Sequence, residues 1–248
     1  MKALVTGASS GIGRDMARYL SSLGYDLVIV ARRENLLEEL KKDLKTNVEI
    51  EVLDVSKEEN CKELFEKHKD IDLLINNAGF GLFGEFTEID LDKEISLIDT
   101  NIKATHILTK LYAKSMKEKN KGKILNVASI AGFMTGPLMS AYYASKNYVV
   151  ELSSGINKEL KKAKSNVRIS ILCPGPVDTN FNNVAGVRFS VKSLSSEYVA
   201  KYAIDKTLKG KEIIIPGIGI KILYGLNKLS PRFISTELAY HTQKSKKK

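Results

Sequence analysis

Short apolar runs alternate with amphipathic stretches along almost the whole chain, and this alternation constrains the fold more than any other feature. The runs are rich in Val, Ile and Leu and show little polar-apolar alternation, as expected for strands buried on both faces of a sheet. Regular alternation of strands and helices predicts an α/β fold built on a doubly wound parallel sheet. The seven runs are KALVT, DLVIVA, VEIEVLDV, IDLLINNAG, KILNVAS, VRISILCPG and KEIIIPG.

The amphipathic stretches between these runs predict the helices of that fold. Hydrophobic residues make up 43% of the 248 positions and charged residues 27%, a composition typical of globular proteins. No linker-like tract divides the chain, so we expect one domain over residues 1–248. Within it we expect a substrate loop or lid at 180–195 and an extension with a basic tail at 217–248. The predicted helices cover 12–23, 34–45, 57–69, 92–119, 141–164 and 196–208.

A stretch of small residues, TGASSGIG, follows the first apolar run and opens the first predicted helix. Gly7 suits a tight turn, Gly11 lets a pyrophosphate approach bare backbone, and Gly13 lets the helix pack closely on the sheet. The amino terminus of the helix attracts the phosphates. A plain turn is the simpler alternative, but the preceding strand and following helix favour a dinucleotide site. Its residues are predicted to be Gly7, Ser9, Ser10, Gly11, Ile12 and Gly13.

The end of the second run bears on the choice of dinucleotide. Ala31 stands where an NAD site offers a carboxylate to the ribose 2′-hydroxyl, and Arg32 and Arg33 follow it. An arginine can bind a 2′-phosphate through two parallel hydrogen bonds, and no carboxylate is present there to repel it. We therefore predict NADP (NADPH) rather than NAD, with Arg32 as the main phosphate contact. The alternative is a pair of solvated arginines at a helix start.

Polar residues also follow the third and fourth runs. Asp54 is placed to accept a hydrogen bond from the adenine amino group, and Val55 to pack on the ring. Asn76 and Asn77 need hydrogen-bond partners inside a buried sheet, so they either connect neighbouring strands or form the floor of the cofactor cleft. The predicted cofactor contacts from these two strand ends are Asp54, Val55, Asn77, Ala78 and Gly79.

The sequence YYASK places Tyr142 and Lys146 four residues apart in a predicted helix, so both project from one face. A nearby ammonium stabilises a phenolate and lowers the pKa of tyrosine from its usual value near 10. Ser129, at the end of the fifth run, can donate a hydrogen bond to a substrate carbonyl. Taken alone, the pair could equally be a surface lysine beside a half-buried ring.

Together these motifs resemble the short-chain dehydrogenase/reductase (SDR) family, whose members have a Rossmann-type fold. The resemblance covers about residues 2–216 and includes NNAG at Asn76–Gly79 and PGPVDT at Pro174–Thr179. It implies Tyr142 as the catalytic acid/base, Lys146 as its partner and a ribose contact, and Ser129 as the group that positions the carbonyl. The implied catalytic set is Asn101, Ser129, Tyr142 and Lys146.

The same resemblance implies roles for two further segments. Asn101 would hold a water that relays protons between Lys146 and solvent. The PGPVDT turn would seat the nicotinamide carboxamide through Val177 and Thr179. The predicted cofactor contacts from this resemblance are Tyr142, Lys146, Pro174, Gly175, Val177 and Thr179.

Three functions follow as hypotheses. The leading one is hydride transfer between NADPH and a hydrophobic ketone or aldehyde, with the reverse reaction on secondary alcohols. The second is a 3-oxoacyl reductase whose substrate is attached to an acidic carrier protein or to coenzyme A. The third is a nucleotide-sensing regulatory protein without catalysis. The family also implies a homodimer or homotetramer.

Apolar residues gather in the loops expected around the substrate, which favours a hydrophobic ligand. The alternative is that they pack on one another or on a second subunit. These residues are Phe80, Leu82, Phe83, Phe133, Met134, Leu138, Met139, Phe181 and Phe189.

The net charge of +10 favours anionic partners such as phosphorylated cofactors, acidic carriers, nucleic acid or a membrane surface. No nucleic-acid module accompanies the terminal KSKKK, so we expect no nucleic-acid partner. The mixed apolar and basic extension at 217–248 is interpreted as a subunit-contact or substrate-covering helix. An interfacial helix attracted to anionic lipid is the less favoured alternative.

Cysteine and histidine usage points to no metal and to a reducing compartment. Cys61 and Cys173 match no redox or metal-ligand spacing and are interpreted as buried hydrophobic residues. His68, His106 and His241 form no metal-spaced group, so we expect no metal site. The chain shows no secretory signal and no apolar run long enough to cross a bilayer, which predicts a cytoplasmic protein.

Overall fold

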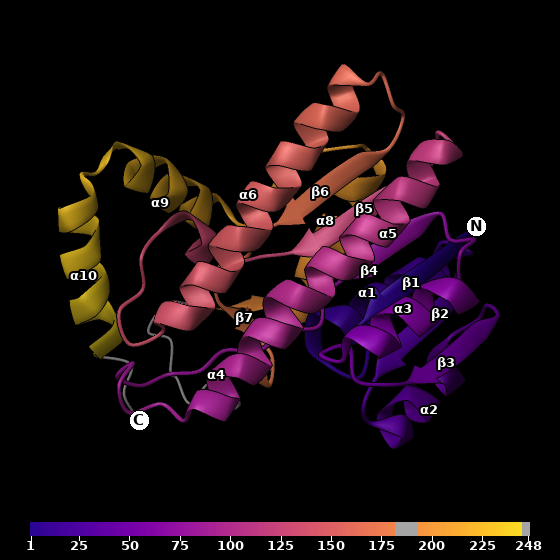
Figure 1. The fold of residues 1–248 in the computed structure, drawn as a ribbon, viewed down its shortest axis with the longest axis horizontal. Helices are drawn as coiled ribbons and strands as arrows, with labels where there is room; N and C mark the ends of the chain where they lie inside the picture. The colour runs from indigo at the N-terminus through magenta and orange to yellow at the C-terminus, as the bar shows by residue number, and fades with distance from the viewer. Residues whose placement is uncertain (182–192, 245–248) are drawn as a thin grey trace.

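Seven parallel strands form one sheet in the order β3-β2-β1-β4-β5-β6-β9 (Figure 1). The computed structural model describes residues 1–181 and 193–244. The predicted doubly wound α/β fold is confirmed, and each of the seven apolar runs supplies one strand. The strands are β1 (Lys2–Thr6), β2 (Asp26–Ala31), β3 (Val48–Val52), β4 (Leu73–Asn76), β5 (Lys123–Val127), β6 (Arg168–Leu172) and β9 (Ile213–Ile214), and a separate pair joins β7 (Val177–Asp178) to β8 (Leu194–Ser195).

One strand departs from the expected pattern. The sequence of β3, VEIEV, alternates glutamate with apolar residues, and none of its five residues is fully buried. Because β3 is the edge strand beside β2, its glutamates reach solvent and pair with Lys2 and Lys67. The expectation of runs without alternation is therefore wrong for this strand, and the reason is its position at the edge of the sheet.

The helices lie close to their predicted bounds, with two differences. A π-helical turn at Asp99–Ala104 interrupts the helix expected over 92–119, and the extension after β9 forms two helices separated by Pro231. The helices are α1 (Gly11–Ser22), α2 (Glu34–Asp43), α3 (Glu58–Lys67), α4 (Leu91–Ile98), α5 (Thr105–Glu118), α6 (Ser140–Lys162), α8 (Ser196–Leu208), α9 (Ile218–Leu229) and α10 (Arg232–Lys244), with a short 3-10 turn at Ile130–Phe133.

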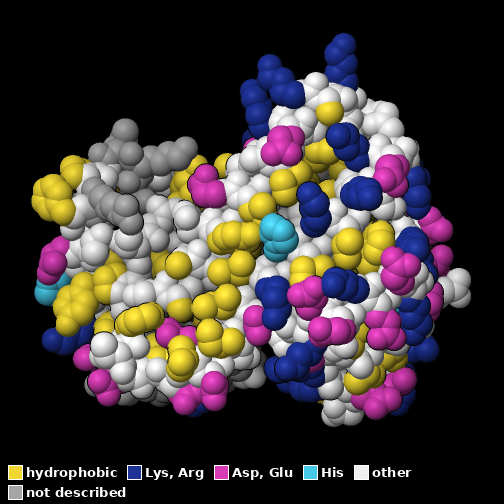
Figure 2. Space-filling view, viewed as in Figure 1, with side chains coloured by type: hydrophobic (Ala, Val, Ile, Leu, Met, Phe, Trp, Pro, Cys, Tyr) yellow, Lys and Arg dark blue, Asp and Glu magenta, His cyan; other side chains and the backbone are white. Residues whose placement is uncertain are grey.

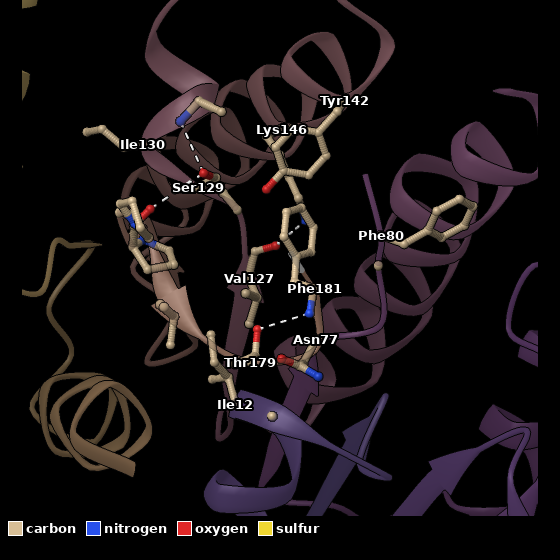
Figure 3. Close-up of a pocket in the computed structure, with 18 of the residues that line it drawn as sticks. Ile12, Asn77, Phe80, Val127, Ser129, Ile130, Tyr142, Lys146, Thr179 and Phe181 are labelled. Carbon is tan, nitrogen blue, oxygen red and sulfur yellow. Dashed lines mark hydrogen bonds between the residues drawn. The ribbon is translucent and has the colours of Figure 1, made fainter. Parts of the chain in front are cut away.

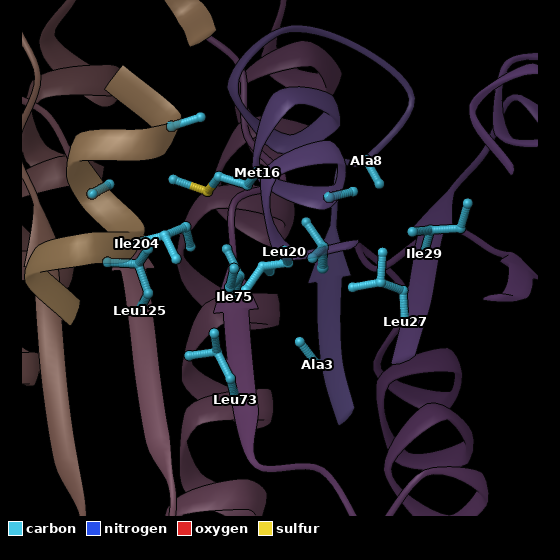
Figure 4. Packing of buried hydrophobic residues seen from close by; sticks show 14 of the residues in the cluster. Ala3, Ala8, Met16, Leu20, Leu27, Ile29, Leu73, Ile75, Leu125 and Ile204 are labelled. Carbon is cyan, nitrogen blue, oxygen red and sulfur yellow. The ribbon is translucent and has the colours of Figure 1, made fainter. Parts of the chain in front are cut away.

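Two hydrophobic layers hold helices on both faces of the sheet. On one face Met16 and Leu20 of α1 and Ile204 of α8 pack against the strands, as Figure 4 shows for Leu73 and Ile75 of β4. On the other face α3, α5 and α6 cover the same strands through a second cluster that includes the buried ring of Tyr112. Burial on both faces explains why the central strands are almost wholly apolar.

Buried polar side chains tie the central strands together. Asn76 of β4 donates hydrogen bonds to Asn126 of β5 (2.9 Å) and to Thr109 of α5 (3.1 Å). Asn77 donates to the carbonyl oxygens of Thr6 (3.0 Å) and Gly7 (3.2 Å). Of the two roles considered for this pair, the contacts show the connection of neighbouring segments for both: Asn76 joins β4 to β5, and Asn77 braces the turn after β1.

The chain leaves β1 toward β2 and β3 on one side and continues from β4 toward β5 and β6 on the other. Where connections diverge in this way, the carboxyl ends of the strands frame a crevice that binds ligands. The ends of β1, β4 and β5 therefore open onto the same cleft.

Candidate active site

A cavity of about 1380 Å³ opens at the carboxyl edge of the sheet, between the glycine-rich turn and α6. Most small-molecule pockets measure about 300–1,000 Å³, so this one has room for a dinucleotide together with a substrate. It brings together nearly all predicted site residues; Gly13 and Asn101 pack behind its wall instead. The predicted residues that line it are Gly7, Ser9, Ser10, Gly11, Ile12, Arg32, Arg33, Asp54, Val55, Asn77, Ala78, Gly79, Ser129, Tyr142, Lys146, Pro174, Gly175, Val177 and Thr179.

The glycine-rich turn needs its glycines for two different reasons. Gly7 (φ 66°) and Gly11 (φ 56°) adopt the left-handed conformation that other residues avoid. Gly13 has an ordinary helical backbone, but a Cβ atom there would lie 2.3 Å from Nδ2 of Asn77 and 2.5 Å from the carbonyl oxygen of Gly7. The turn thus exposes bare backbone to the cavity, while Gly13 lets α1 sit directly against the strand ends.

The two arginines after β2 take different positions. Arg33 donates hydrogen bonds to the hydroxyls of Ser9 (2.9 Å) and Ser10 (3.0 Å) and so closes the outer side of the glycine-rich turn. The Arg32 side chain is 72% exposed and lies 3.8 Å from a carboxylate oxygen of Asp54. Both arginines line the cavity at its end beside the glycine-rich turn.

Ser129, Tyr142 and Lys146 converge on the same part of the cavity (Figure 3). Ser129 stands directly before the 3-10 turn and accepts a hydrogen bond from the amide of Ala131 (3.1 Å). Lys146 donates to the carbonyl oxygen of Val127 (2.9 Å), and its ammonium lies 5.8 Å from the centre of the Tyr142 ring. Strand β5 and helix α6 therefore position all three groups.

Burial controls the protonation of this group. It raises the pKa of Tyr142 above its usual value, and a hydrogen bond with Ser129 partly opposes the shift. This is the reverse of the expected lowering by Lys146, because desolvation of the phenolate is the largest effect. Burial also lowers the pKa of Lys146 to about 8. At neutral pH Tyr142 therefore holds its proton, as a group that donates one must.

Asn101 sits in the π-helical turn and is 1% exposed. Its amide donates to the carbonyl oxygen of Phe80 (2.9 Å) and to Ser145 (3.0 Å), and its oxygen accepts from the amide of Phe80 (3.0 Å). The side chain thus links the loop after β4 to α6, directly behind Gly79.

The apolar residues predicted around the substrate divide into two groups. Phe80, Met134, Met139 and Phe181 line the cavity, and the Phe181 ring lies 5.4 Å from that of Tyr142. Three others pack within the protein, since Leu82 and Phe83 join the cluster around Leu97, and the ring of Phe133 lies 4.5 Å from that of Tyr224 of α9. Leu138 is half-buried and does not line the cavity. Phe189 lies outside the described residues, as do 182–192 of the expected lid, although Leu194 at its end reaches the cavity.

The largest contribution missed by residue-level prediction comes from α9 and α10. Thr236 of α10 is hydrogen bonded to Thr135 (2.7 Å), and Gln243 is hydrogen bonded to the hydroxyl of Tyr143. These contacts hold α9 and α10 beside the cavity, and several of their residues form part of its lining. The only sequence signal was the mixed apolar and basic composition of the segment. The cavity-lining residues from this part are Gly217, Ile218, Gly219, Ile220, Leu223, Leu226, Ser230, Ser235, Leu238, Ala239, Thr242 and Gln243.

Histidines and cysteines occupy structural positions. His68 is hydrogen bonded to Glu51 (2.7 Å), His106 to Tyr148 (2.7 Å) and His241 to Glu237 (3.1 Å). Both thiols are buried and free, and burial raises the pKa of each to about 12. Within residues 1–181 and 193–244 no three His, Cys, Asp or Glu side chains gather as a metal site would require. Over the same residues, no helix has the length and apolar character needed to cross a bilayer.

Comparison with known proteins agrees with this geometry. The family model described as short chain dehydrogenase matches residues 1–186. An uncharacterized oxidoreductase of Staphylococcus saprophyticus is 40% identical over 185 residues, covering 71% of this chain and 78% of that protein. The 3-oxoacyl-[acyl-carrier-protein] reductase of Rickettsia prowazekii is 34% identical over 184 residues, covering 73% of this chain and 74% of the reductase.

Solved structures share the whole architecture. A short-chain dehydrogenase from Sphingobium yanoikuyae in complex with NADPH superposes with a TM-score of 0.81 at 27% identity, covering 92% of this chain and 93% of that one. A short-chain dehydrogenase/reductase from Burkholderia phymatum in complex with NAD gives a TM-score of 0.81 at 26% identity, covering 91% and 92%. One of these two structures therefore holds NADPH and the other NAD.

Proposed function

The chain belongs to the short-chain dehydrogenase family, and from that premise we propose that it is an NADPH-dependent carbonyl reductase for hydrophobic ketones and aldehydes. Membership in the family makes it an oxidoreductase that binds a nicotinamide cofactor. The preference for NADP, the class of substrate and the roles of individual residues are our proposals.

The observation that carries the proposal is the convergence of Tyr142, Lys146 and Ser129 beside a dinucleotide-sized cavity. Burial keeps Tyr142 protonated, so its hydroxyl can donate a proton to a carbonyl oxygen as hydride reaches the carbon. Ser129 adds a second hydrogen bond to the same oxygen and stabilises the charge that develops there. Bound NADPH would supply the hydride.

The remaining residues support this reaction by holding the cofactor and the proton path. The backbone of the glycine-rich turn and the amino end of α1 are proposed to bind the pyrophosphate. Val177 and Thr179 are proposed to face the nicotinamide, and Lys146 its ribose. Asn101 is proposed to hold a relay water, for which its oxygen keeps one lone pair beyond the bond to Phe80.

Replacing Tyr142 tests the chemical step. We expect Tyr142→Phe to lower kcat by about 10²–10⁴-fold, the usual contribution of general acid catalysis, while NADPH binds with unchanged affinity. The matched control is Tyr143→Phe, the neighbouring residue, which should keep kcat within a few-fold. Near-normal turnover by Tyr142→Phe would remove Tyr142 from the mechanism.

Cofactor preference is tested by comparing the two arginines. Because Arg32 is free of the glycine-rich turn, Arg32→Ala should weaken NADPH binding by about tenfold or more and leave NADH binding little changed. Arg33→Ala should weaken both cofactors, since Arg33 braces Ser9 and Ser10. Dissociation constants measured by nicotinamide fluorescence separate these outcomes. A selective loss in Arg33→Ala alone would transfer the phosphate contact to that residue.

The substrate proposal rests on the apolar wall formed by Phe80, Met134, Met139 and Phe181. A 3-oxoacyl group on an acidic carrier is the second candidate, favoured by the positive charge of the chain and by the relative from Rickettsia prowazekii. NADPH oxidation measured against ketones, steroids and 3-oxoacyl thioesters distinguishes them. Absence of turnover with every class, despite cofactor binding, would favour a nucleotide-sensing role.

We further propose a homodimer or homotetramer. The exposed stripe Leu91, Ile95 and Ile98 on α4 supports it, because these residues recur on one helix face and remain exposed in the part of the chain that the structure describes. A cytoplasmic location is proposed from the two cysteines, which are buried as free thiols.

A further inference from the structure

Helix α9 presents an apolar stripe to solvent. Ile218, Ile222 and Leu226 follow one another at intervals of four residues, and their exposed fractions are 77%, 59% and 61%. In α10, Phe233 is 75% exposed and Leu238 63%. Large apolar side chains scattered singly on a surface are ordinary, but a row of them on adjoining helices marks an interaction surface.

The opposite faces of these helices fix their orientation. Ile220 and Tyr224 of α9 pack on the cluster around Val150, and Tyr224 contacts Phe133. In α10, Thr236 and Gln243 hold the helix against Thr135 and Tyr143. Of the exposed apolar residues, Ile222 and Phe233 lie outside the cavity lining, whereas Ile218, Leu226 and Leu238 also line the cavity. Both helices lie at the end of the molecule farthest from β3 (Figure 1).

The charge of the same segment is strongly asymmetric. Residues 217–248 contain seven lysines and arginines and a single glutamate, so they carry +6 of the chain's net +10. A segment that combines exposed apolar side chains with excess positive charge complements an anionic bilayer, which provides acyl chains below a layer of negative headgroups. A second copy of this chain would bring the same positive charge and would be repelled. The charge therefore favours lipid over self-association as the partner of this surface.

The apolar surface is continuous with the cavity. Ile218, Leu223, Leu226 and Leu238 are exposed to solvent and also line the cavity wall. On the face seen in Figure 2, hydrophobic side chains gather over the half that carries α4 and α10, and charged ones over the half that carries α2 and α3. A ligand dissolved in acyl chains could thus enter the cavity without crossing bulk water.

We propose that α9 and α10 dock on anionic membrane surfaces and that hydrophobic substrate enters the cavity from the lipid. The docking itself is independent of the proposed function, whereas the entry of substrate rests on it. The apolar stripe inserts at the headgroup boundary, and the cations supply the second signal that stable peripheral binding requires.

The experiment measures vesicle binding of the full-length protein without cofactor or substrate, so its outcome does not depend on catalysis. Sedimentation is compared for phosphatidylcholine vesicles and for vesicles with about a third phosphatidylglycerol. We expect at least tenfold tighter binding to the anionic vesicles, weakening as salt is raised because screening shortens the range of the attraction. Equal binding to both compositions, or no binding, overturns the proposal.

Paired variants locate the surface. Ile222→Ser with Phe233→Ser should reduce binding to anionic vesicles at least tenfold; neither residue lines the cavity, so NADPH oxidation with a water-soluble ketone should be unchanged. The control, Phe86→Ser with Val52→Ser, removes exposed apolar side chains (65% and 47%) that lie outside both the α4 stripe and the C-terminal helices, and it should bind normally. If the first pair alters only the oligomeric state in analytical ultracentrifugation, a second copy covers this surface and the lipid proposal is wrong.

Discussion

The cofactor end and the C-terminal arm line the same cavity but are built in opposite ways. At the cofactor end the backbone itself forms the site, and a Cβ at Gly13 would lie 2.3 Å from Asn77. In the arm formed by α9 and α10, side chains form the site, and a Cβ at Gly219 or Gly225 would meet nothing within 4 Å. One end tolerates almost no added atom, whereas the other has open space around it.

This difference indicates which end of the cavity can change its ligand specificity. A pyrophosphate is the same in every dinucleotide, so a rigid backbone cradle at the ends of β1 and β4 suits it. Substrates differ in shape, and an arm that packs beside the sheet, through contacts such as those to Thr135 and Tyr143, can change its cavity-lining side chains without disturbing the strands. Substitutions that add or remove single groups test this contrast, and four follow in order of expected effect.

Gly13→Ala should have the largest effect. Its methyl group would meet Asn77 and the carbonyl oxygen of Gly7, so α1 must move away from the strand ends. Overpacking of this kind costs roughly 3 kcal/mol or more at the tightest sites, and we expect that loss in urea unfolding together with loss of cofactor binding. Gly155→Ala on α6 is the control, because no atom lies within 4 Å of the added group and stability should rise slightly. Equal behaviour of the two variants would contradict the close packing.

Lys146→Met should stabilise the fold while it removes activity. Burial lowers the pKa of Lys146 from 10.5 to about 8. Below pH 8 the folded protein therefore carries a buried ammonium, which is better solvated in the unfolded chain. Methionine removes this penalty, worth up to about 3 kcal/mol for a shift of this size, less the lost bond to Val127.

The pH dependence distinguishes this cause from better packing. Between pH 8 and 10.5, Lys146 keeps its proton in the unfolded chain but has released it in the folded chain. The free energy of unfolding of the wild-type protein therefore rises with pH over this range. The advantage of Lys146→Met should therefore be full near pH 7 and shrink as the pH approaches 10.5. Urea unfolding of both proteins at pH 7 and pH 9.5 measures it. A constant difference would show that charge burial is not the cause.

The site positions that lie at strand ends could be predicted from the sequence. Gly7, Arg32, Asp54 and Ser129 follow the ends of predicted strands, and the parallel sheet that the alternation of strands and helices predicts brings such positions to one edge. Local pattern was sufficient because parallel strands end at one edge.

Other features depend on contacts between distant segments and could not be read locally. The π-helical turn at Asn101 depends on Phe80 and Ser145, which lie far away in sequence. The bond between Gln243 and Tyr143 joins residues a hundred positions apart. The raised pKa of Tyr142 depends on its burial, which the Tyr-Lys spacing does not reveal. Motif spacing and the family resemblance together predicted these groups, but only the assembled cavity sets their protonation.

Gln243→Leu should have a smaller effect, in the arm. Gln243 is 2% exposed, and its side-chain oxygen has no hydrogen-bond partner among the described residues. Leucine removes that unpaired buried oxygen, which stabilises the fold, and also removes the bond to Tyr143, which destabilises it, so the two effects nearly cancel and stability should change by less than about 1 kcal/mol. The KM for an apolar ketone should shift several-fold at constant kcat, because the cavity wall changes and Tyr142 does not. Lys244→Gln, the exposed neighbour, should leave KM unchanged; a fall in kcat for Gln243→Leu would place this residue in the chemical step.

Gly225→Ala should have the smallest effect and tests the contrast most directly. Gly225 is exposed in the middle of α9 and an added Cβ meets nothing within 4 Å. Alanine is favoured over glycine inside a helix by about 0.5–1 kcal/mol, so thermal unfolding should shift slightly upward with turnover unchanged. At Gly13 the same methyl group is expected to disrupt the protein. If Gly225→Ala instead destabilises the protein at high concentration but not at low, another copy packs against α9, and the arm is no longer the open wall that distinguishes it from the cofactor end.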